Sequence, residues 1–484
     1  MTGLSKSGIW LQVAGLLALG GCSLGPNFER PALTLPAQYT TEGPWVAAAP
    51  HDAIPKGAWW EIFGDADLNQ LETAALAGSQ TLKAAVARLT QARAQITVAS
   101  ADLFPTVGVT AGATRSRDSI NRPRLDPQVP NFSTLQNDYT PAFTVNYEPD
   151  LFGRVSGQVT ESVANAAEVE AMLENTRLLV TSEVAADYYN LRELDIEIDV
   201  IRQSIEAQQH ALDFVAARHD LGVASGLDLA QQQAQLDSTT TQIDLLRNQR
   251  AQFQHAIAAL VGVPAAGFMI AAAPTQLVVP AIPVSVPSDL LERRPDVAAA
   301  ERAVAVSNAS IGVALAAYFP NLNLSGQYGR ESTELANLFT APSVAWVLGL
   351  SLTETIFDAG RRSANVEIAR AATSEASANY RDAVLTAVKE VEDGLTGLET
   401  LARASAEAQR AVASSQRALD LANDRYSGGL ATYLDVVTAQ GQVLTNERQA
   451  VQIRGQQLVT AVYLVKALGG GWEGLSAETE KPAA

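Results

Sequence analysis

The chain has 484 residues and a formal net charge of −18, because 34 Lys and Arg stand against 52 Asp and Glu. This acidic balance argues against a nucleic-acid-binding protein, which requires a basic surface. One Cys and four scattered His provide neither a disulfide framework nor a metal-ligand cluster. No constellation of nucleophile, base and orienting group indicates an enzyme. We therefore expect no metal and no catalytic activity.

Residues 1–21 have the features of a secretory signal peptide. An apolar run of about 11 residues, Ile9 to Leu19, is too short to span a bilayer as a helix. The segment Leu19-Gly20-Gly21-Cys22 that follows resembles a bacterial lipobox, and Ser23 in place of Asp indicates the outer membrane. We expect a covalent lipid, such as palmitate, on Cys22 and no other cofactor. An ordinary signal peptide with an incidental cysteine is the alternative.

The mature chain is predicted to consist of two repeats of one unit. In each repeat a helix is followed by two strands and two long helices. A lipid-anchored extension at 22–65 precedes them, a linker at 262–288 separates them, and a short polar tail at 469–484 follows. The first repeat covers 66–261, with a helix at 66–101, strands at 105–115 and 139–149, and long helices at 155–220 and 226–261. The second covers 289–468, with a helix at 289–317, strands at 319–330 and 343–354, and long helices at 361–427 and 432–468.

An internal duplication explains this order. The eleven residues from Arg218 to Asp228 share the skeleton Arg-x-x-x-Gly-apolar-Ala-Ser/Thr-x-Leu-Asp with those from Arg425 to Asp435, 207 positions later. A Phe-Pro pair also opens the first strand of each repeat. A fixed-gap match of this length is a strong sign of duplication.

The longest predicted helices carry the apolar spacing of coiled coils. Val384, Val388, Val391, Leu395 and Leu398 follow one another in steps of four and three. A helix of about 66 residues, at 1.5 Å per residue, would extend roughly 100 Å. We therefore expect long rods that pack against partner helices.

The four predicted strands alternate between apolar and small or polar residues. In the second, Phe143, Val145 and Tyr147 alternate with Thr144 and Asn146. Strands of about ten residues with this pattern are typical of outer-membrane barrels. Four strands cannot enclose a water-filled interior, and an open sheet edge in lipid leaves backbone groups unpaired. The barrel must then close between identical chains with cyclic symmetry, in a number that the pattern does not fix.

The sequence resembles the lipoprotein efflux branch of the TolC family of outer-membrane factors. Three groups of residues carry the resemblance, and they span almost the whole mature chain. They are Gly25-Pro26-Asn27-Phe28 with Arg30-Pro31; Trp59-Trp60, Phe63, Asp65 and Leu68; and Leu290-Leu291-Glu292-Arg293-Arg294-Pro295-Asp296 with Ala300-Glu301, Ile311-Gly312 and Phe319-Pro320.

The resemblance implies a mixed α+β membrane protein. Three chains would form one twelve-stranded β-barrel, continuous with a long periplasmic α-helical barrel. It also implies a passive exit duct for drugs or other small toxic compounds in a tripartite efflux system. The expected partners are a periplasmic adaptor, an inner-membrane transporter of the RND type and outer-membrane lipid.

The helix turns are the predicted functional sites. By the resemblance they meet the adaptor, through Arg218, Gly222, Val223, Ala224 and Ser225 in the first turn and Arg425, Gly429, Leu430, Ala431 and Thr432 in the second. Asp435, Asp228 and Tyr426 match positions of the periplasmic gate. Ala431 and Thr438 depart from the family's Arg and Asp, so packing rather than charge pairs is a possible lock. A plain αα-hairpin turn, or carboxylates that only begin a helix, are the alternatives.

Other interpretations stay open. An exit channel for type I protein secretion is possible within the family, and a structural periplasmic lipoprotein without a pore is possible outside it. Arg115, Arg117, Arg122 and Arg124 between the first two strands suggest a basic rim for lipopolysaccharide phosphates, although a solvated loop is the simpler explanation.

Overall fold

The computed structural model describes residues 24–33, 57–121, 135–274, 277–280, 282 and 293–470. The chain forms two compact units. The strand unit comprises Met1–Pro31, Thr90–Glu168 and Glu301–Asn379, and the helix unit comprises Ala32–Leu89, Val169–Ala300 and Tyr380–Ala484. Each sequence repeat therefore contributes to both units.

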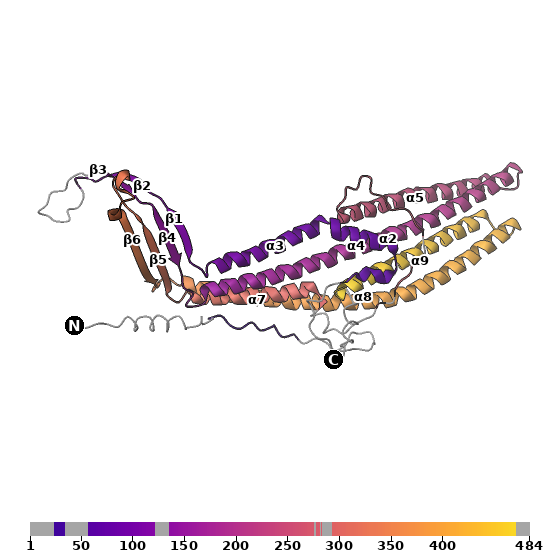
Figure 1. Cartoon of the computed structure of the whole chain (residues 1–484). Coiled ribbons are helices and arrows are strands. Elements are labelled where there is room, and N and C mark those ends of the chain that lie inside the picture. The colour runs from indigo at the N-terminus through magenta and orange to yellow at the C-terminus, as the bar shows by residue number, and fades with distance from the viewer. Residues whose placement is uncertain are drawn as a thin grey trace, which may run out of the picture. The chain divides into compact units, whose positions relative to one another are not determined.

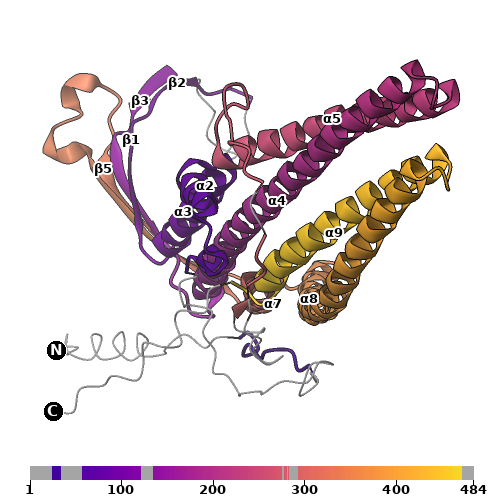
Figure 2. The same cartoon turned by 90° about the vertical axis from the view of Figure 1, so that its right-hand side faces the viewer.

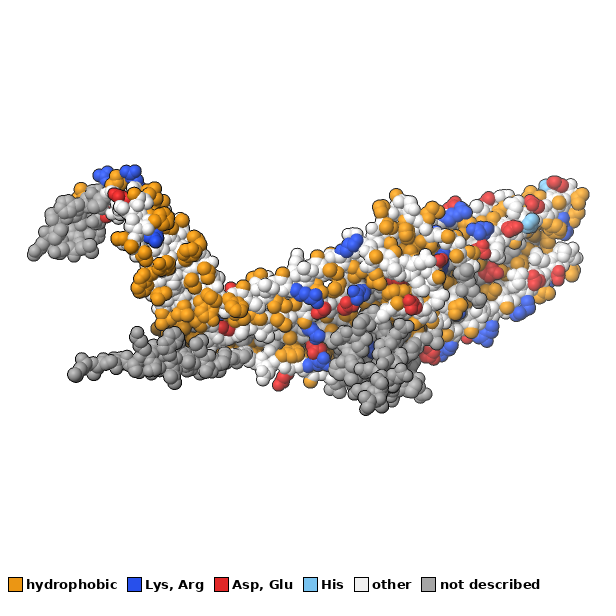
Figure 3. Space-filling model, viewed as in Figure 1, with side chains coloured by type: hydrophobic (Ala, Val, Ile, Leu, Met, Phe, Trp, Pro, Cys, Tyr) orange, Lys and Arg blue, Asp and Glu red, His pale blue; other side chains and the backbone are white. Residues whose placement is uncertain are grey.

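The strand unit contains an antiparallel four-stranded sheet in the order β1-β4-β5-β6 (Figure 1). Its strands are β1 (Thr106–Thr110), β4 (Ala142–Tyr147), β5 (Asn321–Arg330) and β6 (Val344–Thr353). The register places Phe143 opposite Tyr328, and Leu324 opposite Leu350. These side chains share one exposed face, which Figure 3 shows as a hydrophobic surface along the strands. The predicted alternation is confirmed.

The first predicted hairpin is divided into two pieces. Instead of single strands at 105–115 and 139–149, β1 and β4 form one ladder, and β2 (Ala113–Arg117) and β3 (Leu135–Tyr139) form a second. The interruption lies at Pro141, which has no N–H to donate to a ladder. Gly112 and Thr140 still exchange backbone hydrogen bonds across it. The prediction of two uninterrupted strands was wrong because it ignored this proline.

The predicted helix at 66–101 is also divided, into α2 (Ala66–Gly78) and α3 (Gln80–Ala101). Asp65 begins α2 by accepting hydrogen bonds from the N–H groups of the first turn. At the other end of α2, a Cβ atom on Gly78 would collide with the carbonyl oxygen of Val261. The two backbones meet without room for a side chain, and Ser79, whose ψ of 123° is not helical, separates α2 from α3.

The long helices agree with the predicted spans within a residue at each end. They are α4 (Arg154–Asp220), α5 (Gly226–Val261), α8 (Arg361–Ser427) and α9 (Tyr433–Ala467). The helix α7 (Pro295–Ala316) begins later than the predicted residue 289, and residues 283–292 lie outside the described ranges. Short 3-10 turns are η1 (Trp59–Phe63), η3 (Leu335–Asn337) and η4 (Ala341–Ser343).

In the helix unit, α4 with α5 and α8 with α9 form two helix hairpins (Figure 2). Tyr188 and Leu191 of α4 pack with Trp59, Ile257 of α5 and Leu458 of α9 in the main hydrophobic cluster. Burial of such apolar seams is the main stabilising contribution to long helices in water. Of the residues with the predicted coiled-coil spacing on α8, Val384 and Val391 are buried, and Gly394 between them and Leu398 lies against Leu464 of α9.

Candidate functional site: the hairpin tips and the polar network of the helix unit

Both helix hairpins reverse direction at a glycine with a left-handed backbone. Gly222 has a φ of 74° and Gly429 a φ of 73°. In each tip, the N–H of the residue after the glycine donates to a carbonyl oxygen five positions earlier, at 2.8 Å. Residues with a Cβ atom seldom adopt this conformation, which explains a glycine at each turn.

The two tips are joined by an aromatic and charged cluster. The guanidinium of Arg218 lies 5.1 Å from the ring centre of Tyr426 and 5.6 Å from that of Phe214. The Tyr426 hydroxyl donates to Asp228 at 3.4 Å, and its ring meets Tyr433 edge to face at 4.9 Å. The Arg218 side chain is therefore engaged within its own chain, and its contact with an adaptor stays a prediction.

A buried hydrogen-bond chain lies behind this cluster. The Tyr433 hydroxyl donates to the side-chain oxygen of Gln232 at 2.8 Å, and the Gln232 amide donates to the carbonyl oxygen of Gln208 at 2.8 Å. All three residues are buried. Burial raises the pKa of Tyr433, so the phenol remains a neutral donor. Gln232 and Gln208 were not among the predicted site residues, although polar residues within an apolar seam are a usable signal.

The two predicted gate carboxylates begin helices. The N–H of Ser225 donates to Asp228 at 3.4 Å, and the N–H of Thr432 donates to Asp435 at 2.9 Å. Carboxylates at this third helical position complete a capping box. The helix-start role is thus real for both residues, and their part in a gate stays a prediction. Burial, and then the charge of Asp228, raise the pKa of Tyr426.

The tips also expose large apolar side chains. Leu221 is 80% exposed and Leu430 is 75% exposed. Three more exposed apolar residues flank the turns, namely Val223, Leu227 and Leu434. Val223 and Leu430 were among the predicted contacts, whereas Leu221, Leu227 and Leu434 were not. Apolar residues next to a turn glycine would have been the signal for them, since exposed apolar clusters mark interaction sites.

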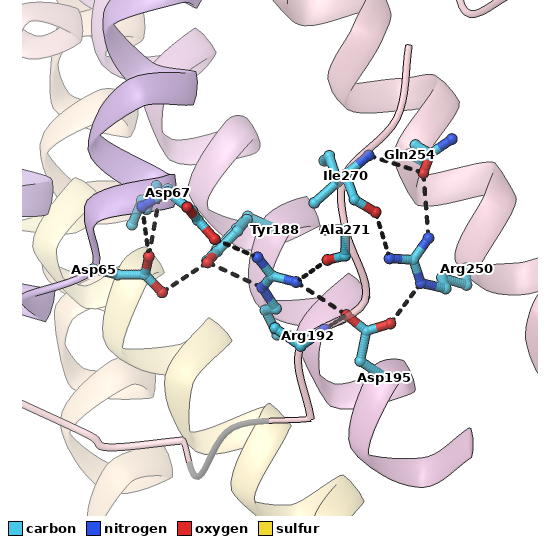
Figure 4. Close-up of polar contacts among 11 residues, drawn as sticks. Asp65, Asp67, Tyr188, Arg192, Asp195, Arg250, Gln254, Ile270 and Ala271 are labelled. Carbon is cyan, nitrogen blue, oxygen red and sulfur yellow. Dashed lines mark hydrogen bonds and ion pairs between the residues drawn. The ribbon is translucent and has the colours of Figure 1, made fainter. Parts of the chain in front are cut away.

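A second polar cluster, centred on Arg192 of α4, lies inside the helix unit (Figure 4). The buried guanidinium donates to the Tyr188 hydroxyl at 3.0 Å, to Asp195 at 3.1 Å and to Asp67 at 2.8 Å. It also donates to the carbonyl oxygen of Ala271 at 2.7 Å. A buried charge with four partners joins α2, α4 and the segment after α5.

The same network continues on both sides of Arg192 (Figure 4). The Tyr188 hydroxyl donates to Asp65 at 2.7 Å. Arg250 of α5 binds the buried Asp195 at 2.5 Å and donates to the carbonyl oxygen of Ile270 at 2.8 Å. Only Asp65 of this group was among the predicted residues. Tyr188, Arg192 and Asp195 follow helical spacing on α4, but their partners Asp67 and Arg250 come from distant segments, which no local pattern connects to them.

Within the described ranges, no three His, Cys, Asp or Glu side chains gather in a way that would hold a metal ion. Among the helices that the structure describes, none combines the length and hydrophobicity that a membrane-spanning helix requires.

Comparisons with known proteins identify the family. The sequence profile described as outer membrane efflux protein matches residues 71–263 and 286–470. The chain belongs to this family. It is an outer-membrane efflux channel, and the two matched segments coincide with the two repeats.

Individual relatives cover nearly the whole chain. The "Pyoverdine export outer membrane protein OpmQ" of Pseudomonas aeruginosa is 32% identical over 95% of this chain and 96% of its own. The "Outer membrane protein OprJ" of the same organism is 32% identical over 94% of each chain. Among solved structures, the outer-membrane channel OprN has a TM-score of 0.83, with 29% identity over 93% of this chain and 100% of its own.

The motifs that resemble this efflux family have structural reasons in the helix unit. The Trp59 indole N–H donates to the Thr181 hydroxyl at 3.1 Å, and Trp60 meets the Trp59 ring edge to face. The buried Arg294 binds Asp296 at 2.7 Å and Glu390 at 2.6 Å. Leu290 to Glu292, the first part of that motif, lie outside the described residues.

The strand unit of the efflux channel explains the remaining motifs. Arg30 forms a two-pronged ion pair with Glu301, at 2.9 and 2.7 Å. Gly25 lies against the backbone of Gly312 so closely that a Cβ atom would approach within 3.1 Å. The segment after the predicted lipobox is thereby held on α7. Cys22 itself, like Arg122 and Arg124, lies outside the described residues, so its lipidation stays a prediction.

Proposed function

We propose that three copies of this efflux channel assemble into one twelve-stranded barrel with a helical periplasmic tunnel. The observation that carries the proposal is the four-stranded sheet of the strand unit. One of its faces is apolar and exposed, and β1 and β6 each pair on one side only among the described residues. An open edge in lipid costs several kcal/mol per unpaired group, which closure between copies would remove.

In this proposal the channel is the exit duct of a tripartite system. Its partners are a periplasmic adaptor and an inner-membrane transporter of the RND type. The exposed apolar residues of the tips, with Leu221 and Leu430 the most exposed, support docking of adaptor helices. A lipid on Cys22 would add a second anchor to the barrel. The cargo is drugs or other small toxic compounds; the relative OpmQ carries pyoverdine export in its name.

The tip cluster supports a role as the closed periplasmic gate. Arg218, Tyr426 and Asp228 connect one hairpin to the other, so opening the tips must separate these contacts. In a three-fold assembly, Asp435 would supply three carboxylates around the axis, which repel each other and attract cations. Because Asp435 is exposed, its charge is free to act on passing ions while it caps α9.

The test is a pair of measurements on the purified full chain. We expect a trimer mass in detergent and single-channel conductance in planar bilayers. Removing the gene from a host that carries a matching adaptor and pump should sensitise it to pump substrates, and the wild-type chain should restore resistance. A chain that stays monomeric in detergent and in membranes, and shows no conductance, would contradict the proposal and favour a structural lipoprotein. Loss of protein secretion with unchanged drug sensitivity would favour type I export.

A further inference from the structure

The sheet of the strand unit has one internal junction between the repeats and one open junction. Inside the chain, β4 of the first repeat pairs with β5 of the second. The open edges are β6 of the second repeat and β1 of the first. If copies close a barrel, as proposed above, β6 of one copy lies beside β1 of the next. The residues that follow Thr353 then lie next to the residues that precede Thr106.

An aromatic pair covers the internal junction. Phe152 lies in the linker that follows β4, and Phe319 lies directly before β5. Their rings stack, with centres 4.9 Å apart and planes inclined by 21°. Stacked aromatic pairs contribute beyond the area that they bury. The contact joins the linker of one repeat to the strand entrance of the next.

The open edges β1 and β6 are flanked by similar apolar residues, but these side chains are exposed. Phe104 precedes Pro105 and β1 as Phe319 precedes Pro320 and β5. It is 68% exposed. In the linker after β6, Ile356 is 93% exposed and Phe357 is 86% exposed. Phe104 and the Ile356–Phe357 pair lie at opposite edges of the sheet, and large apolar side chains that are exposed at a sheet edge indicate an interaction surface.

The two linkers are similar but not identical. Gly153 and Gly360, which precede α4 and α8, are 207 positions apart, the same offset as the tips. In the second linker Asp358 and Ala359 separate the apolar pair from the glycine, so Phe357 lies two residues further from it than Phe152 does from Gly153. The linkers after β4 and β6 therefore occupy equivalent places relative to the sheet, although their residues do not align one by one.

Polar contacts hold the second linker in place. Asp358 accepts hydrogen bonds from the N–H of Gly360 at 3.1 Å and from the guanidinium of Arg362 at 2.9 Å. Arg362 also binds Glu354 at 2.9 Å, and its guanidinium lies 5.1 Å from the ring centre of Tyr318. The exposure of Ile356 and Phe357 thus belongs to a linker that is fixed at both ends.

We propose that Ile356 and Phe357 of one copy pack on Phe104 of the next copy. This intersubunit clasp would repeat, between chains, the contact that Phe152 and Phe319 make within one chain. The surface of Ile356 and Phe357 is covered by a second copy rather than by lipid, because the sheet order places Phe104 of a neighbour beside Phe357. The proposal rests on the proposed assembly.

Cysteine crosslinking tests the clasp directly. The chain has one cysteine, Cys22, which is predicted to be lipidated and so not to react. Phe104→Cys combined with Phe357→Cys, treated in outer membranes with an oxidant or a short bismaleimide, should give covalent dimers and trimers. Each single variant should remain monomeric on denaturing gels. As a matched control, Phe152→Cys with Phe319→Cys should link within one chain only.

Truncation gives an independent measurement. Phe104→Ala and Phe357→Ala should each weaken subunit association about tenfold or more, as expected when a phenylalanine loses its burial. The double variant should lose less than the product of the two effects, because both remove one contact. Phe339→Ala, at an equally exposed phenylalanine in the loop between β5 and β6, should leave association unchanged.

The mass of the wild-type particle in detergent, measured together with the crosslinking, distinguishes the clasp from the assembly on which it rests. Trimers without crosslinks, together with fully multiplicative truncation effects, would overturn the clasp and leave the assembly standing. Trimers in which Phe104 and Phe357 are labelled by a lipid photoprobe, and not crosslinked to each other, would assign these side chains to the membrane interface and also overturn the clasp. A monomeric wild-type chain would overturn the assembly and the clasp together.

Discussion

The two hairpin tips have the same backbone conformation, but their side chains make different contacts. Gly222 and Gly429 shape nearly identical turns, yet the first tip supplies Arg218 and Asp228 while the second supplies Tyr426 to bind both. The repeats also differ further along the helix unit. In the first repeat Arg192 pairs with the fully buried Asp195 as well as with the exposed Asp67, whereas in the second Arg294 pairs with two carboxylates that are about one third exposed. Duplication thus preserved the backbone plan, and the two copies then acquired complementary side chains.

The largest expected effect is on the buried arginine of the first repeat. Arg192→Met leaves Asp195 buried with Arg250 alone, and breaking a buried pair costs about 3–5 kcal/mol. Arg294→Met leaves no comparably buried acid unpaired, because Asp296 and Glu390 are about one third exposed, and we expect a loss of about 1–3 kcal/mol. The midpoint of thermal unfolding in detergent compares the two variants. Equal losses would show that the repeats do not differ in this respect.

Glu72, in the first repeat, makes stability depend on pH. Burial raises its pKa to about 9 from the model-compound value of 4.5. The folded state therefore holds the proton more tightly than the unfolded state, so the stabilisation is complete below about pH 4.5 and is lost as the pH rises towards 9. Glutamine does not ionise, so Glu72→Gln removes this contribution to the pH dependence of stability.

We accordingly expect the unfolding midpoint of Glu72→Gln to exceed that of the wild type at pH 8, by a margin that shrinks at pH 5. Thermal unfolding at several pH values in one detergent measures this. Glu174→Gln, at a partly exposed glutamate of α4 that pairs with Arg177, serves as the control. Parallel pH profiles of the Glu72→Gln variant and the wild type would refute the prediction.

Substitution of the turn glycines tests how similar the tips are. Gly429→Leu and Gly222→Leu each place a side chain at positive φ, which costs about 1–2 kcal/mol, while the space around both positions is open. We expect assembly to persist and adaptor crosslinking and efflux to be lost. Gly429→Asn, which tolerates this conformation better, should retain most activity. Normal adaptor crosslinking in the leucine variants would rule out the tips as the docking site.

The tyrosines of the second tip should separate stability from gating. Tyr433→Phe leaves the buried oxygen of Gln232 without its donor, at a cost of about 1–3 kcal/mol. Tyr426→Phe removes only a half-buried 3.4 Å bond, so its thermal midpoint should change little. If the tip cluster is the gate, Tyr426→Phe should nevertheless raise single-channel conductance. A stable, unaltered channel in Tyr426→Phe would remove this residue from the gate.

The smallest effect on stability concerns the two capping carboxylates. Asp435→Asn and Asp228→Asn retain much of the capping box, since the asparagine side-chain oxygen can still accept the backbone N–H of the N-cap residue, and should cost a few tenths of a kcal/mol. We expect Asp435→Asn to reduce cation preference in planar bilayers, because Asp435 is exposed, and Asp228→Asn to act mainly through Tyr426. Unchanged ion selectivity in Asp435→Asn would exclude a carboxylate ring at the gate.

Local patterns in the sequence determined the order of helices and strands, the duplication and the tips. Apolar spacing, the turn glycines and strand alternation act over a few residues, so they are visible without the fold. The clearest errors, at Pro141 and Gly78, came from single residues that interrupt otherwise regular patterns. The efflux function was predicted from the resemblance of motifs such as Trp59-Trp60 and Arg294 to the family. The sequence did not show which contacts these residues make.

Only the tertiary structure decided which distant groups meet. Arg192 binds Asp67 from 125 positions away, and Tyr433 reaches Gln232 across 201 positions. Glu72 became a buried acid, and Phe152 found Phe319, because packing brought their helices and strands together. Such pairings depend on how whole elements fold against one another, and no local rule of spacing or propensity encodes them.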